Sequence, residues 1–226
     1  MTKQEFGETD RSLADRSLAG RIASALAARI VAGDLAPDTP VRQDHIAVEF
    51  QASHVPVREA FRKLEAQGLL IAAPRRGVRV APLDPDALIE VTEMRAVLEP
   101  LALRHAMPKL AEPDLAVAEE ALLAAETSRD IAVWEAANRR FHAALWHPCA
   151  MPRLRATLDD LNRVAARYLY ATWKELAWQP RSDQEHRDLL AIIRSGERDL
   201  ACERLGDHIL AAGQALHAHL TQPDRA

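Results

Sequence analysis

Three histidines in the second half of the chain are candidates for binding a metal ion. His142 lies in "NRRFHAAL", His186 in "DQEHRDLL" and His208 in "GDHIL". Imidazole nitrogen is a common ligand of Zn, Ni, Fe and Mn, and ligands on facing helices converge in the core of a helical bundle. Asn138 lies one helical turn before His142, on the same face. From the residues alone, a shared metal and separate hydrogen-bonded structural roles are equal alternatives for these histidines.

A second group of residues could contact DNA. Ser53 to Val80 holds six basic residues and two acidic ones, although the whole chain has a formal net charge of -4 at pH 7. A local basic patch is what binding to a polyanion requires, so the overall charge does not exclude DNA. The candidate contacts are Arg42, Ser53, His54, Val55, Arg58, Arg62, Arg75, Arg76 and Gly77.

Several of these residues belong to a predicted helix that begins near Ser53. Ser53 suits an N-cap, and Pro56 falls in the first turn, where a missing backbone N–H costs nothing. Val57, Phe61 and Leu64 predict its buried stripe. A helix in the major groove reads bases from its N-terminal end while nearby basic groups hold phosphates. A lone basic helix more often presents solvated charges, but a glycine and a basic hairpin follow this one, and that order favours DNA binding.

Two further helices are predicted before it. Residues 1–17 are polar without apolar periodicity and are expected to form a flexible tail. Apolar residues recur every four positions from Leu18 to Ile30 and predict a helix that ends at Gly33. Val41 to Phe50 predict a short second helix.

A basic hairpin completes this domain. Leu69–Ile71 and Val78–Val80 are short β-type runs on either side of Pro74–Gly77, which predicts two strands with a basic tip. Three helices and a two-stranded wing over residues 18–82 predict a winged helix-turn-helix.

The proline-rich segment Ala81–Pro85 marks a predicted domain boundary. Residues 83–226 are rich in Ala and Leu, with helical spacing interrupted at prolines and at Gly196. This pattern predicts an all-α bundle, so that the whole protein is mainly α. The expected helices are about 85–107, 113–128, 131–146, 152–177, 183–195 and 199–220.

Composition narrows the class of protein. Cys149 and Cys202 are too few for a disulfide framework, and no apolar run has the length of a membrane span. We therefore expect a cytoplasmic protein with no membrane partner.

The segment "GDLAPDTPVRQDHIAVEFQASHVPVREAFRKLEAQGLLIAAPRRGVRV" resembles the DNA-binding domain of GntR-type transcription regulators. In that family a Ser-Arg-x-Pro-Val-Arg-Glu-Ala-Leu run forms the recognition helix, and Ser53 to Phe61 matches it. His54 stands where arginine is usual, Asp38 where glycine is usual, and Arg42 where serine often caps the second helix. The resemblance implies a double-stranded DNA operator, and His54 implies an altered one, because imidazole cannot make arginine's bidentate guanine contact.

Residues from about 85 to 220 resemble the helical ligand-binding domain of the FadR subgroup, called FCD. Its pattern is an Asp-x-x-x-His, then a Glu-His, then a histidine in the last helix. Asn138 with His142, Glu185 with His186, and His208 occupy these places, so the resemblance implies a divalent transition metal (Zn, Ni, Mn or Fe). Asn138 departs from the pattern, and an uncharged amide predicts lower metal affinity or another preferred ion.

The same resemblance implies a small organic-acid effector at the metal. Arg95 resembles the arginine that pairs with the effector carboxylate, and Arg163 is a second candidate. Either arginine could instead form a surface ion pair, and Glu99 is a partner available to Arg95 one turn away.

The predicted function is a homodimeric DNA-binding repressor that a carboxylate metabolite regulates through this metal. One recognition helix reads few base pairs, so we expect a homodimer on a short inverted repeat. A metal-dependent hydrolase with an appended DNA-binding module is the alternative, with Glu185 as its base. A metal-free architectural DNA-binding protein is a third possibility, and it leaves the histidines without a role.

Overall fold

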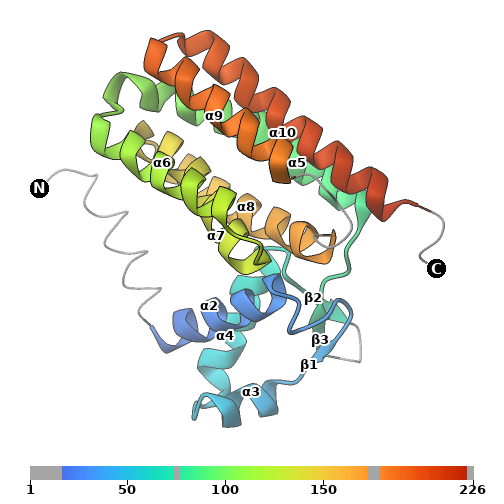
Figure 1. Cartoon of the computed structure of the whole chain (residues 1–226). Helices are drawn as coiled ribbons and strands as arrows, with labels where there is room; N and C mark the ends of the chain where they lie inside the picture. The colour runs from blue at the N-terminus through green and yellow to red at the C-terminus, as the bar shows by residue number, and fades with distance from the viewer. Residues whose placement is uncertain (1–16, 74–76, 173–178, 223–226) are drawn as a thin grey trace, which may run out of the picture. The chain divides into compact units, whose positions relative to one another are not determined.

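The computed structural model describes residues 17–73, 77–172 and 179–222 (Figure 1). The chain forms two compact units that divide between Leu83 and Asp84. None of the helices within the described ranges is both long enough and apolar enough to span a membrane.

The N-terminal unit contains three helices. These are α2 (Leu18–Val31), α3 (Gln43–Glu49) and α4 (His54–Ala66). Ile22, Leu26, Val57 and Leu64 are buried among the apolar residues that predicted α2 and α4, while Leu18 is half-buried. Ser17 is the N-cap of α2, where its side chain accepts a hydrogen bond from Gly20. The rest of the predicted tail, residues 1–16, lies outside the described residues.

The wing has three strands rather than the predicted two. Strands β1 (Pro40–Val41), β3 (Gly77–Val80) and β2 (Leu70–Ala73) form an antiparallel sheet in that order. The prediction that Val41 opens the second helix is therefore wrong. Its side chain is buried and it pairs with Val78, because the chain reverses at Asp38, whose φ is 63°. Packing of Val41 in the sheet outweighs the helical spacing of its neighbours.

The C-terminal unit is a bundle of six long helices within the described residues. They are α5 (Pro85–Ala106), α6 (Glu112–Thr127), α7 (Ile131–Trp146), α8 (Pro152–Thr172), α9 (Gln179–Ser195) and α10 (Arg198–Leu220). Two short 3-10 turns, η1 (Met107–Lys109) and η2 (His147–Cys149), follow α5 and α7. The fold is thus mainly α, as predicted.

Two of the predicted helices, 152–177 and 183–195, adjoin residues that the structure does not describe. Helix α9 is described from Gln179, so it already includes residues 179–182, which precede the predicted start at 183, and Pro180 lies within it instead of breaking it. Helix α8 is described to Thr172, and the rest of its predicted length, 173–177, lies outside the described residues.

Helices α5 and α10 approach each other closely. Helix α10 packs along α5 (Figure 1). A Cβ atom at Gly213 of α10 would collide with the Thr92 side chain of α5. Gly213 therefore allows the two backbones to come together beside the histidines of the bundle core.

Candidate metal centre and DNA-binding helix

The three predicted metal ligands converge in the bundle core. His142 lies on α7, His186 on α9 and His208 on α10. All three are buried, with 2%, 1% and 7% of their surface exposed. One ligand nitrogen from each lies within 4.8 Å of the others. His142 and His186 are 44 residues apart in the sequence, and His186 and His208 are 22 residues apart. Packing of their three helices therefore brings them together at one potential coordination site.

Packing orients the rings. Phe141, the residue before His142, stacks on the His186 ring with 4.1 Å between centroids and 24° between planes. The His142 and His208 rings are also nearly parallel, with centroids 5.5 Å apart. A buried aromatic neighbour thus restricts the rotamer of one candidate ligand, which favours a preformed site.

A buried carboxylate fixes the orientation of His142. Oε2 of Glu99, on α5, lies 2.8 Å from Nδ1 of His142. Burial by itself would raise the pKa of Glu99, but the charges of Arg95 and His142, and their hydrogen bonds, lower it to about 2. An ionised carboxylate can only accept, so Nδ1 of His142 donates. Nε2 then keeps its lone pair for a metal.

The same arrangement recurs at His208. Oε2 of Glu185 lies 2.7 Å from Nδ1 of His208, and this hydrogen bond is the main cause that lowers the pKa of Glu185. The other carboxylate oxygen of Glu185 accepts from Nε of Arg181 at 2.7 Å. Both oxygens of Glu185 are thus engaged, which fits a group that orients a ligand better than a general base.

The distance between two ligand atoms fits a metal site. Nε2 of His186 and Nε2 of His208 are 3.1 Å apart. Two nitrogens each 2.0–2.1 Å from a zinc ion are separated by roughly 2.8–3.4 Å at bond angles between octahedral and tetrahedral values. Without metal the pair can share one proton as a hydrogen bond, so metal binding would replace that hydrogen bond with two coordination bonds.

Burial keeps two of the candidate ligands neutral. It lowers the pKa of His186 well below its usual range, and neighbouring histidines add to the effect. Burial also lowers the pKa of His208, although the hydrogen bond with Glu185 opposes the shift. A neutral imidazole is the form that binds metal, so at neutral pH no imidazolium proton has to be released before coordination.

A cavity of about 30 Å³ adjoins the histidines. Arg95, Asn138, His142 and His208 line it, together with apolar residues of α5, α7, α8 and α10. Asn138 is half-buried and lies one turn before His142, as predicted. This volume can hold an ion with a water molecule, but not an organic acid of several atoms.

The two candidate effector arginines lie in different surroundings. Arg95 lines the cavity, and its Nε donates to Oε1 of Glu99 at 2.9 Å. The pair is buried rather than on the surface, because Glu99 is fully buried and 13% of the Arg95 side chain is exposed. Arg163 is not among the cavity-lining residues and pairs with Asp160 at 3.1 Å.

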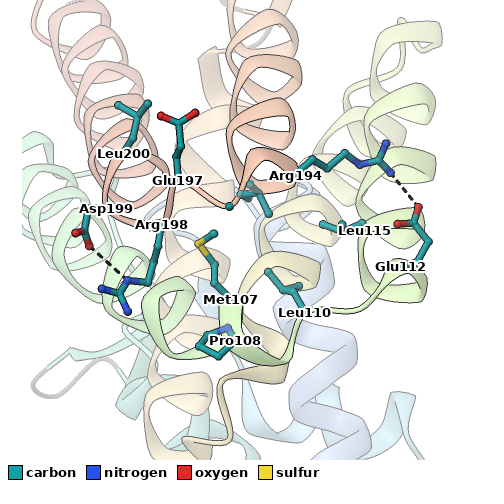
Figure 2. Close-up of a pocket in the computed structure, with 12 residues that line it drawn as sticks. Met107, Pro108, Leu110, Glu112, Leu115, Arg194, Glu197, Arg198, Asp199 and Leu200 are labelled. Carbon is teal, nitrogen blue, oxygen red and sulfur yellow. Dashed lines mark hydrogen bonds and ion pairs between the residues drawn. The ribbon is translucent and has the colours of Figure 1, made fainter.

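A larger hollow of about 960 Å³ lies elsewhere on the bundle, between η1, α6 and the turn from α9 to α10 (Figure 2). Its lining includes the apolar residues Met107 and Leu110 and the cations Arg194 and Arg198. Arg194 pairs with two glutamates of α6, and Arg198 lies 3.5 Å from Asp199. Its cations are already neutralised and its lining contains no histidine, so the smaller cavity is the better candidate site.

The N-terminal unit presents the predicted DNA-contacting residues of α4 to solvent. Ser53 is the N-cap, but its side chain makes no capping hydrogen bond, and His54, Val55, Arg58 and Arg62 are exposed. Nε2 of Gln43 donates to the backbone oxygen of His54, which ties α3 to the start of α4.

The charges of this surface are available to an anion. Among the described residues, no carboxylate lies within 4.0 Å of the guanidinium of Arg42, Arg58 or Arg62, whereas Arg29 and Arg79 of the same unit are paired with acidic residues. Gly77 has a φ of 81°, a conformation that glycine adopts without strain. Arg75 and Arg76 lie outside the described residues.

Comparisons with known proteins agree with both halves of this architecture. Residues 18–80 match the family model described as "Bacterial regulatory proteins, gntR family", and residues 90–221 match the FCD domain. The probable D-xylose utilization operon transcriptional repressor of Paenarthrobacter nicotinovorans is 28% identical over 206 residues, which is 90% of each chain. The galactonate operon transcriptional repressor of Escherichia coli K12 is 28% identical over 203 residues, which cover 80% of this chain and 89% of that one.

Solved structures show the same fold. A GntR family member from Pseudomonas syringae pv. tomato is 30% identical with a TM-score of 0.56, and the match covers 90% of this chain and 87% of that one. Escherichia coli McbR/YncC has a TM-score of 0.79 at 23% identity, covering 91% and 99%. The relatives whose names describe transcriptional repressors and regulators exclude the hydrolase alternative. The chain belongs to the GntR family of bacterial transcription regulators, with an FCD domain of the FadR type.

Proposed function

We propose that the protein is a homodimeric repressor of a short inverted-repeat operator, whose DNA affinity changes when a small carboxylate binds at a transition metal. His142, His186 and His208 would hold the metal, with Asn138 as an additional ligand. The observation that carries this proposal is the convergence of three buried histidines beside a cavity that contains Arg95. A shared metal ion would stabilise the imidazole nitrogens of these histidines, because buried polar atoms without a partner are costly in an apolar core.

A metal here would supply a positive charge and open coordination positions to an anionic ligand. Glu99 and Glu185 support such a role, because each carboxylate lies within hydrogen-bond distance of Nδ1 of a candidate ligand. Histidine ligands of metals usually donate a hydrogen bond from their second ring nitrogen to a carboxylate or carbonyl. Arg95 supports carboxylate binding, because its guanidinium reaches the cavity and planar guanidinium matches carboxylate geometry. The name of one relative refers to galactonate, which is itself a carboxylate.

The small cavity suggests how binding could be transmitted. A ligand larger than the present 30 Å³ must separate the helices that line the cavity, and these include α5, the first helix after the unit boundary. An effector changes DNA affinity only if it binds one arrangement of the paired DNA-binding units better than another. Widening of this cavity is the structural difference that would provide such a preference.

Elemental analysis of protein purified without chelator tests the metal, and we expect close to one transition-metal ion per chain. His142→Ala, His186→Ala and His208→Ala should each lower that content. Protein that contains no metal and neither binds nor is stabilised by added Zn, Ni or Mn would contradict the proposal. His105→Ala, which removes an exposed histidine of α5 and leaves the three candidate ligands and their carboxylate partners in place, is the matched control.

A DNA experiment tests the regulatory half. Duplexes selected in vitro for binding should contain a short inverted repeat, and fluorescence anisotropy should show that a screened organic acid changes the affinity of the metal-loaded protein. The same acid should have little effect on metal-stripped protein or on Arg95→Ala. Operator binding that stays the same with every carboxylate tested would instead support the architectural DNA-binding alternative.

A further inference from the structure

Helix α5 carries a stripe of exposed residues opposite its buried face. Glu90, Met94, Val97, Leu101 and Arg104 are all exposed and follow one another at alternating spacings of four and three residues. This spacing places them along one side of a helix over about 21 Å. Leu88, Thr92, Glu99 and Leu103, on the other side of α5, are buried.

The centre of this stripe is unusually apolar for a surface. Val97 is 68% exposed, Met94 40% and Leu101 37%. Eight large hydrophobic side chains are exposed in the described part of the chain, and these are three of them. A fourth, Leu210, lies on the neighbouring α10 one turn after Gly206, which packs against Ala96 and Pro100 of α5. An apolar patch of this kind on a surface marks an interaction site.

The charges at the ends of the stripe identify the partner. Glu90 and Arg104 are each seven residues from Val97, one toward each end of the helix. If two copies of α5 pack antiparallel about a two-fold axis at Val97, Glu90 of one copy faces Arg104 of the other, twice. Met94 of one copy then lies beside Leu101 of its partner. A surface that complements itself under a two-fold rotation is what an isologous dimer requires.

We infer that this stripe, defined as Glu90, Met94, Val97, Leu101 and Arg104, is where a second copy of the chain packs. The inference rests on the proposed homodimer and adds its interface and orientation. Arg104 also pairs with Asp199 of its own chain at 2.6 Å, and guanidinium has enough donors to bind a second carboxylate. Charged residues at heptad flanks set partner orientation in the same way in coiled coils.

Substitutions at the two-fold position give the sharpest test. A residue at Val97 faces its own copy, so Val97→Glu places two like charges together and should raise the dimer dissociation constant by roughly a hundredfold. Val97→Lys should do the same. Mixing the two variants should restore a heterodimer, because opposite charges then meet. Leu123→Glu changes another exposed residue, on α6, and should leave the dimer intact.

Charge exchange at the ends tests orientation. Glu90→Arg or Arg104→Glu alone should weaken the dimer, and the double variant should recover it, because each end again pairs opposite charges. Parallel packing would bring each residue against itself, and the double variant would then bring no recovery. Sedimentation equilibrium and thermal melting, measured on the full chain, separate loss of association from loss of folding.

Two outcomes would overturn the inference. A dimer that keeps its affinity in Val97→Glu would show that another face forms the interface, while the proposed regulatory function would stand if that variant still binds the operator. Wild-type protein that is monomeric both free and on operator DNA would overturn the inference together with the proposed dimer.

Discussion

Oε2 of Glu99 lies 2.8 Å from Nδ1 of His142, with both side chains buried on neighbouring helices. The same carboxylate accepts from Arg95 through its other oxygen, and Asn162 donates to it at 3.2 Å. Glu99 thus links the candidate effector arginine of the cavity to a candidate metal ligand. A change in the charge or position of Arg95 therefore alters the electrostatic field at His142, and a change at His142 alters the field at Arg95.

Glu99→Gln should weaken metal binding by about 10- to 100-fold, because loss of the anionic partner lowers the basicity of His142 and weakens the hydrogen bond that orients its ring. Competition with a chelator measures the affinity. Glu93→Gln removes an exposed charge from the same helix and should leave metal affinity unchanged. Equal affinity in wild type and Glu99→Gln would mean that His142 is not held for a metal by this carboxylate.

Asn138→Asp should raise affinity for a divalent metal by supplying an anionic ligand one turn before His142. The half-buried position at the cavity gives the new carboxylate access to the ion. Asn138→Ala is the comparison, and we expect it to bind metal more weakly than wild type. If the aspartate variant binds no better than the alanine variant, position 138 is not a ligand.

Metal-free protein should lose stability as pH falls below about 6.5. Burial lowers the pKa of His186 and His208 in the folded chain, so below the ordinary histidine value the unfolded chain binds more protons. Stability therefore rises with pH in this window. Urea midpoints with chelator between pH 5 and 8 measure the slope, which His186→Phe should reduce. A wild-type midpoint that is flat over this range would contradict the expected shift.

Sequence patterns predicted most of this architecture because helical spacing reflects burial. Ile22, Leu26, Val57 and Leu64 are all buried at the positions that predicted their helices. Strand β1 could not be predicted in this way because two residues are too few for a β pattern, and only pairing with β3, distant in sequence, identifies them as a strand.

The site was predictable in part for a similar reason. Histidines are recognisable in a sequence, so the convergence of His142, His186 and His208 could be anticipated. The role of Glu99 toward His142 could not, because 43 residues separate them and only packing of α5 on α7 brings them together. The sequence near Glu99 gave one indication of its role, because Arg95 lies one helical turn before it and could pair with it.

Gly213→Ala should destabilise the bundle by about 1–3 kcal/mol, because the new methyl group overlaps the Thr92 side chain and forces α5 away from α10. Thr92→Ala removes the obstruction, so the double variant should recover much of the stability. Denaturant unfolding of the two single variants and the double gives their coupling energy. Gly206→Ala is the milder control, since its methyl group would lie 3.3 Å from the backbone oxygen of Ala96. Additive effects at 92 and 213 would refute this account of their packing.

Arg58→Ala should weaken binding to the selected operator and lower the slope of log affinity against log salt by about one unit for each phosphate that the arginine neutralises. Arg58 is exposed on α4 without a carboxylate partner among the described residues, so its charge is available to a phosphate. Arg29→Ala is the matched control, because Arg29 belongs to the same unit but pairs with Glu49 at 3.0 Å. Anisotropy titrations at several salt concentrations give both slopes. An Arg58→Ala slope equal to that of Arg29→Ala would remove Arg58 from the DNA interface.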